Sequence, residues 1–155
     1  MEDISEIVIF VALGAAFAAG VAFLARWGKQ NPIRICAYAL IAVAFLYVGL
    51  SLSSDNPKSW TAIEMTGVAL FGSAAGLSLI ASPWFVVIGL ALHPLWAIVF
   101  HFVGSGSAFT PAPLALASAG FTGALALYAA FSILQKKPAS ASVSGPQQKK
   151  GRARS

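Results

Sequence analysis

The sequence has few charged residues: Asp, Glu, Lys and Arg make up 10% of its 155 residues, whereas 58% are hydrophobic. A water-soluble domain of this length needs many more polar side chains to cover its surface. The shortage of charge therefore excludes a soluble globular protein and indicates that a lipid bilayer surrounds most of the chain.

Cysteine is almost absent as well, because Cys36 is the only one. A single cysteine excludes a disulfide within the chain and a cysteine metal cluster. No lysine lies inside an apolar run, which argues against a retinal Schiff base, and neither a nucleophile paired with histidine and acid nor a phosphate-binding glycine loop is present. The basic pI near 9.7 comes without a basic helix interleaved with aromatics, so we expect no nucleic-acid partner.

What the chain does contain is a series of long apolar runs. A bilayer core about 30 Å thick requires about 20 helical residues, and five runs approach that length. They predict an all-α integral membrane bundle with helices over about 7–25, 35–52, 61–82, 84–103 and 114–134. A four-helix alternative would merge the third and fourth helices into a re-entrant pair. Residues 1–134 then form one transmembrane domain, and 135–155 form a basic tail that we expect to be disordered because it has almost no large apolar residue.

The basic residues predict the orientation. Arg26, Lys29 and Arg34 follow the first run, six more basic residues lie in 135–155, and only Lys58 lies elsewhere. By the positive-inside rule the first loop and the tail are cytoplasmic, which places the N-terminus outside. The predicted location is the bacterial inner membrane.

Small and aromatic residues predict local contacts. Gly14 and its alanine neighbours would allow another helix to approach the first one closely, and similar faces in the third and fifth helices suggest a homo-oligomer. Ser82 and Pro83 predict a tight hairpin, with Ser82 as the N-cap of the fourth helix. Tyr38 and Tyr47 are predicted to anchor the second helix at the membrane interface.

Three titratable residues lie within or beside the apolar runs, and such residues are default site hypotheses in a membrane. Glu64 lies 19 residues before Pro83 and His101 lies 18 after it, so a tight hairpin would bring them to the same depth. His93, ten residues after the turn, is expected near the bilayer midplane, level with Ser73.

Helical spacing limits what the two histidines can do together. His93, Ala97 and His101 follow one stripe, but the histidines are separated by about 12 Å along the axis. They cannot both bind one metal ion, whose bonds to nitrogen are about 2 Å long. Glu64 and His101 could supply two metal ligands, which is the alternative to a site without metal.

A proline lies next to the first histidine. Pro94 lacks the amide that would donate to the carbonyl of Leu90, so the helix is predicted to kink beside His93. The kink could open a polar pocket lined by Ser73 and Trp96. The alternative is an ordinary membrane proline beside a buried, hydrogen-bonded histidine.

The segment from His93 to His101 resembles a helix found in a family of small bacterial multipass membrane proteins of unknown function. That helix reads approximately H-x-x-W-D-x-x-H-H and follows a glutamate on the preceding helix. The matching positions, within a resemblance that covers roughly 35–134, are His93, Trp96, His101 and Glu64. Ala97 and Phe100 replace the aspartate and the first paired histidine of the motif. The resemblance therefore implies a similar bundle without the carboxylate between the two histidines.

Two kinds of function fit these observations. The first is a non-enzymatic helix-packing or interaction protein, without cofactor, in which Glu64, His93, Trp96 and His101 form a polar patch inside the membrane. The second is a protein that handles a divalent metal, haem or protons, or transports a small solute, through Glu64, His93 and His101. The sequence identifies no substrate or ligand.

Overall fold

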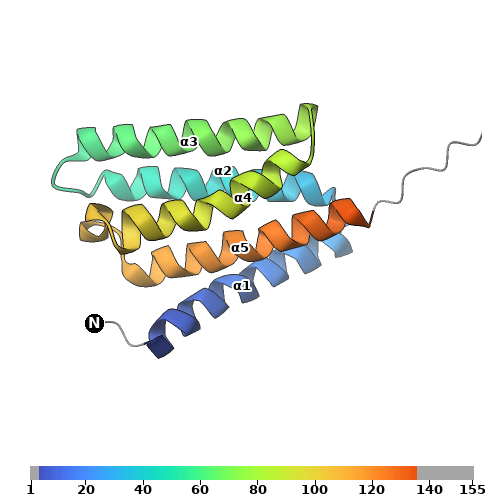
Figure 1. Cartoon of the computed structure of the whole chain (residues 1–155), viewed down its shortest axis with the longest axis horizontal. Helices are drawn as coiled ribbons and strands as arrows, with labels where there is room; N and C mark the ends of the chain where they lie inside the picture. Colours follow the sequence, from blue (N-terminus) through green and yellow to red (C-terminus); the bar gives the residue numbers. More distant parts are fainter. Residues whose placement is uncertain (1–3, 136–155) are drawn as a thin grey trace, which may run out of the picture.

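The computed structural model describes residues 4–135, in which the chain is entirely helical apart from short turns (Figure 1). The elements are α1 (Ile4–Trp27), α2 (Pro32–Ser51), α3 (Pro57–Ile80), α4 (Trp84–Trp96), the π-helix η1 (Ala97–Phe102), the short 3-10 helix η2 (Ser105–Ala108) and α5 (Ala112–Leu134). Helix α4 continues directly into η1, so that together they form one span. The predicted all-α class is confirmed, and the predicted tail beyond Gln135 lies outside the described residues.

Five spans are long and apolar enough to cross a membrane: α1, α2, α3, α4 with η1, and α5. Five, rather than the four of the alternative, is therefore the number supported by residues 4–135. Figure 1 shows the spans side by side, with α1 inclined at the edge of the bundle and running in the same direction as α5. Helix α5 is the most deeply buried span, because it packs between α1 and α4.

Proline and asparagine define where the helices begin. The side chain of Asn31 accepts a hydrogen bond from the amide of Ile33 at 3.0 Å, and Pro32 occupies the first turn of α2. The tight hairpin between α3 and α4 is present, but the prediction that Ser82 caps α4 is wrong. Helix α4 has no side-chain cap; instead the Ser82 carbonyl accepts from the Phe85 amide at 3.1 Å. The tight turn uses the backbone of Ser82 in place of its hydroxyl.

Glycine allows α1 to lie directly on α5. A Cβ atom on Gly14 would clash with the carbonyl of Ala117, and one on Gly120 would clash with the carbonyl of Val11. The close approach predicted for the first helix therefore has α5 of the same chain as its partner. The glycines at 72 and 76 of α3, by contrast, face open space.

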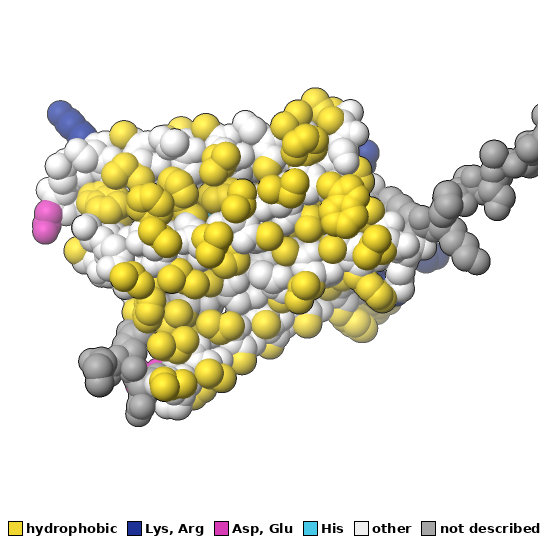
Figure 2. Space-filling view, viewed as in Figure 1, with side chains coloured by type: hydrophobic (Ala, Val, Ile, Leu, Met, Phe, Trp, Pro, Cys, Tyr) yellow, Lys and Arg dark blue, Asp and Glu magenta, His cyan; other side chains and the backbone are white. Residues whose placement is uncertain are grey.

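The surface of the bundle is apolar between its two ends. Figure 2 shows hydrophobic side chains over the whole middle of this face, whereas Lys, Arg, Asp and Glu atoms appear only at the ends. Large apolar side chains such as Leu127 and Phe17 are well exposed. A surface of this kind requires lipid as its solvent, so the chain is an integral, multipass membrane protein.

Candidate functional site

The centre of the site is a buried pair between α3 and η1. Glu64 is 2% exposed and His101 is 0% exposed, and Glu64 Oε1 lies 3.2 Å from His101 Nε2. The predicted meeting of these residues across the hairpin is confirmed. Although the distance is that of an ion pair, neither atom has a hydrogen-bond partner in the described part of the chain, so the two groups touch without the alignment of a hydrogen bond.

The segment that follows η1 folds back over His101. Thr110 Oγ1 lies 3.1 Å from His101 Nδ1 in a hydrogen bond, and the ring of Phe109 meets the imidazole edge to face, with 5.8 Å between ring centroids. A Cβ atom on Gly106 would lie 2.7 Å from His101 Nδ1, so only glycine fits there. Thr110 and Gly106 lie between the predicted helices 84–103 and 114–134 and were not among the predicted site residues. The small residues of the GSGS segment were the only feature of the sequence that indicated a close approach to another part of the chain.

The kink predicted at Pro94 stays a prediction, but the helix changes type three residues after it. Helix α4 ends at Trp96, and the π-helix that follows it has its closing hydrogen bond from the Val103 amide to the Ile98 carbonyl, at 2.9 Å. A π turn contains one more residue than an α turn, so it changes the direction of His101 relative to a continuous α-helix. The stripe of His93, Ala97 and His101 is fully buried.

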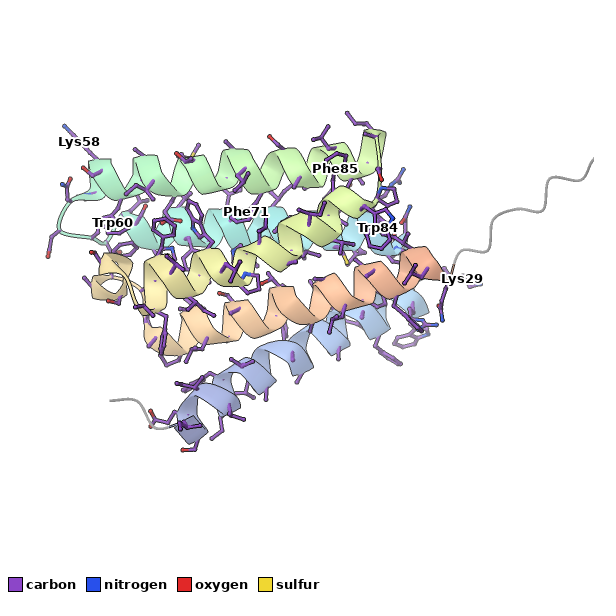
Figure 3. The ribbon with its side chains drawn as sticks, viewed as in Figure 1. Lys29, Lys58, Trp60, Phe71, Trp84 and Phe85 are labelled. Atoms are coloured by element: carbon purple, nitrogen blue, oxygen red, sulfur yellow. The ribbon has the colours of Figure 1, made fainter. Side chains whose placement is uncertain are left out.

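His93 lies in the same interior but has different partners. Its Nδ1 is 3.3 Å from Thr122 Oγ1 of α5, while its Nε2 is buried and without a partner among residues 4–135. Phe71 packs on the imidazole with 5.1 Å between ring centroids, and Figure 3 shows Phe71 between α3 and α4. The prediction that Ser73 lines this site is wrong. Ser73 is exposed, because two residues turn an α-helix by about 200° and so place it opposite Phe71.

Trp96 lies beside the buried polar cluster formed by Glu64, His93 and His101, and its ring covers one side of that cluster. The ring is half-buried and lies edge to face with Phe71, with centroids 5.8 Å apart, and it covers Gly67, where a Cβ would come within 3.1 Å of it. Trp96 thus separates the polar interior from lipid.

Tyr47 is a member of the cluster that the sequence did not reveal. Its predicted role as an interfacial anchor is wrong, because it is 1% exposed. The ring stacks on His101 at 4.1 Å between centroids and lies 5.8 Å from His93. Ser118 donates to the carbonyl of Ala115 at 2.9 Å, so the Tyr47 hydroxyl donates to Ser118 at 2.5 Å.

The cluster is closely packed. The residual space beside Glu64 and His93 does not admit a water molecule, although about 150 Å³ is not filled by atoms. In residues 4–135 no three His, Cys, Asp or Glu side chains are close enough together to hold one metal ion. The arrangement therefore offers a carboxylate and two imidazoles in a dry interior, with no open cavity.

No family model, curated protein or solved structure matches the chain. The resemblance carried by His93, Trp96 and His101 gains no support from these comparisons. The fold and the cluster together define a class: a multipass membrane protein of five helices with buried contacts between glutamate and histidine.

Proposed function

We propose that the protein is a non-enzymatic membrane protein that acts through helix packing and interaction, with the cluster around Glu64 as its internal anchor. The observation that carries this proposal is that the polar contacts of the cluster join different elements. These contacts are Glu64 of α3 with His101 of η1, Tyr47 of α2 with Ser118 of α5, and His93 of α4 with Thr122 of α5. Hydrogen bonds between membrane helices contribute about 0.6 kcal/mol each on average. The two hydrogen bonds named here, together with the contact between Glu64 and His101, join four packed spans.

The absence of free space beside the cluster supports the same proposal. Neither a substrate nor haem can reach Glu64 or His93 without a large rearrangement of the packing. A rigid interior of this kind fixes the outer faces of the helices, which are the surfaces available to neighbouring proteins in the bilayer.

Self-association is the most direct form of such an interaction. The faces around Gly14 and Gly120 cover each other within the chain, whereas Gly72 and Gly76 of α3 face open space. Small residues at that spacing allow two helices to approach closely. We therefore propose that a second copy packs on the outer face of α3.

Crosslinking in detergent over a broad protein concentration range tests this form of the proposal. A crosslinked dimer is expected, and the paired change Gly72→Leu with Gly76→Leu should abolish it. Gly49→Leu is the matched control, because Gly49 of α2 also faces open space and should leave the dimer intact. Monomer alone at every concentration would contradict self-association.

A second candidate function is the binding of a small cation, either a proton or a divalent metal. It is favoured by three buried atoms without hydrogen-bond partners in the described residues, namely Glu64 Oε1, His93 Nε2 and His101 Nε2. Both histidines have Nδ1 beside a threonine hydroxyl, an arrangement that orients the other nitrogen of metal-binding histidines. Unpaired buried polar atoms are rare enough to require an explanation.

Metal analysis and an absorption spectrum of the protein purified from membranes separate the two candidates. Stoichiometric metal that is lost in His101→Ala, or a haem absorption band that is lost in His93→Ala, would overturn the purely structural proposal. A colourless, metal-free preparation would eliminate the metal form of the second candidate and leave proton binding as its remaining form.

A further inference from the structure

A groove of about 390 Å³ lies between α1 and α5, and none of its lining residues belongs to the cluster around Glu64. Its walls are mostly alanine, including Ala15 and Ala22 of α1 and Ala124 of α5. Arg26, in the last turn of α1, lies at one end of it. A second hollow shares Arg26 and extends to Trp27, so the groove continues around the end of α1.

Two polar groups of this groove have no partner among residues 4–135. Arg26 is exposed and has no carboxylate beside it among residues 4–135, where the only ion pair is the one between Glu64 and His101. The Tyr128 hydroxyl is shielded from solvent and makes no hydrogen bond in the described residues. An unpaired buried phenol requires an explanation, and the Tyr128 side chain lines the groove.

The dimensions of the groove fit one lipid chain. Ala15 and Arg26 are separated by 11 residues, which is about 16 Å of α-helix. Half of a bilayer core is about 15 Å thick, which is the depth that the acyl chains of one leaflet occupy. The groove therefore runs from the level of Arg26 to about the middle of the membrane.

We propose that this groove binds an anionic phospholipid. One acyl chain lies along the alanine walls and Arg26 binds the phosphate. Lys29 lies in the turn that follows α1 and Arg34 in the first turn of α2, so the headgroup meets positive charge on the adjoining surface as well. Figure 3 labels Lys29 at this end of the bundle and Lys58 at the opposite end.

Charge also argues for a lipid over a second copy of the chain in this groove. Two copies related by a two-fold axis along the membrane normal would bring Arg26 of each copy towards the other. Like charges that meet near lipid are destabilising, whereas a phosphate neutralises Arg26.

Native mass spectrometry of the full chain with added phospholipid tests the proposal. We expect phosphatidylglycerol to bind more tightly than phosphatidylcholine with the same acyl chains. Arg26→Gln should weaken phosphatidylglycerol binding about fivefold, which is the effect of one basic residue near an anionic lipid surface. Ala124→Leu, which fills the groove, should weaken the binding of both lipids. Lys58→Gln is the control, because it also removes one positive charge but at the opposite end of the bundle.

Three results would overturn the proposal. The first is equal binding of the two lipids by the unaltered protein. The second is an unchanged preference for phosphatidylglycerol in Arg26→Gln, measured on protein whose circular dichroism matches that of the unaltered chain. The third is a dimer that disappears in Ala124→Leu while lipid binding stays constant, which would assign the groove to a second copy.

Discussion

Glu64 and His101 lie where an unpaired charge would be costly, and each is the closest titratable partner of the other. Removing one partner from a buried polar pair exposes the other to the full desolvation penalty. The pair therefore contributes to stability mainly because neither member can be lost alone.

We predict that Glu64→Leu lowers the free energy of unfolding by about 1–3 kcal/mol, because it removes the carboxylate that faces the buried His101 Nε2. Glu64→Gln keeps the shape and an amide that can bond to the imidazole, so its effect should be smaller. Thermal unfolding in detergent measures both, with the exposed Glu6→Gln as a control. Equal stability of Glu64→Leu and the unaltered protein would contradict a stabilising pair.

The two tyrosines of α2 allow a matched comparison. Tyr47→Phe removes the hydroxyl that donates to Ser118 and keeps the ring stacked on His101, so a loss of about 0.5–1.5 kcal/mol is expected. Tyr38 is 59% exposed, and Tyr38→Phe should change stability little. If the two variants have the same effect in thermal unfolding, the Tyr47 hydroxyl has no structural role.

At the scale of elements, the contact between α1 and α5 depends on glycine. Gly14→Leu or Gly120→Leu places a side chain where the partner backbone now lies, and we expect each to cost about 1–3 kcal/mol through overpacking. Gly20→Leu is the control on the same helix, because Gly20 faces open space. In thermal unfolding, Gly20→Leu should cause the smallest loss of stability of the three variants. A larger loss than in Gly14→Leu or Gly120→Leu would contradict the close contact between α1 and α5.

The number of helices and the pairing of Glu64 with His101 could be predicted from the sequence, because the lengths of the apolar runs and the tight hairpin determine them. Which face of each helix points inward could not be predicted. In a membrane, lipid and protein interior are both apolar, so hydrophobicity does not distinguish Phe71, which faces inward, from the lipid side of α3. Ser73 and Tyr47 were misplaced for this reason.

The π-helix and the returning loop were also beyond prediction. The conformation of η1 and the position of Thr110 on His101 arise from packing between segments, whereas Pro94 indicates only that regular hydrogen bonding is interrupted. The order of residue types along the chain does not specify how these segments pack against each other.

At the scale of the whole molecule, the start of α1 and the end of α5 lie at opposite ends of the bundle (Figure 1). We propose that the end after α5 is cytoplasmic, because the basic residues concentrate in the loop after α1 and in 135–155. A cytoplasmic reporter fused after Ser155 should be active, and one inserted at Asp55, between α2 and α3, should be inactive. The opposite pattern would reverse the orientation.

The position of α1 has a consequence for biogenesis. Its main partner is α5, the last of the five spans to be synthesised, so α1 has to wait for this contact until the fifth span has been made. Its high hydropathy, the greatest of the five, makes such a wait tolerable. A chain that lacks α5 would leave α1 without its main partner.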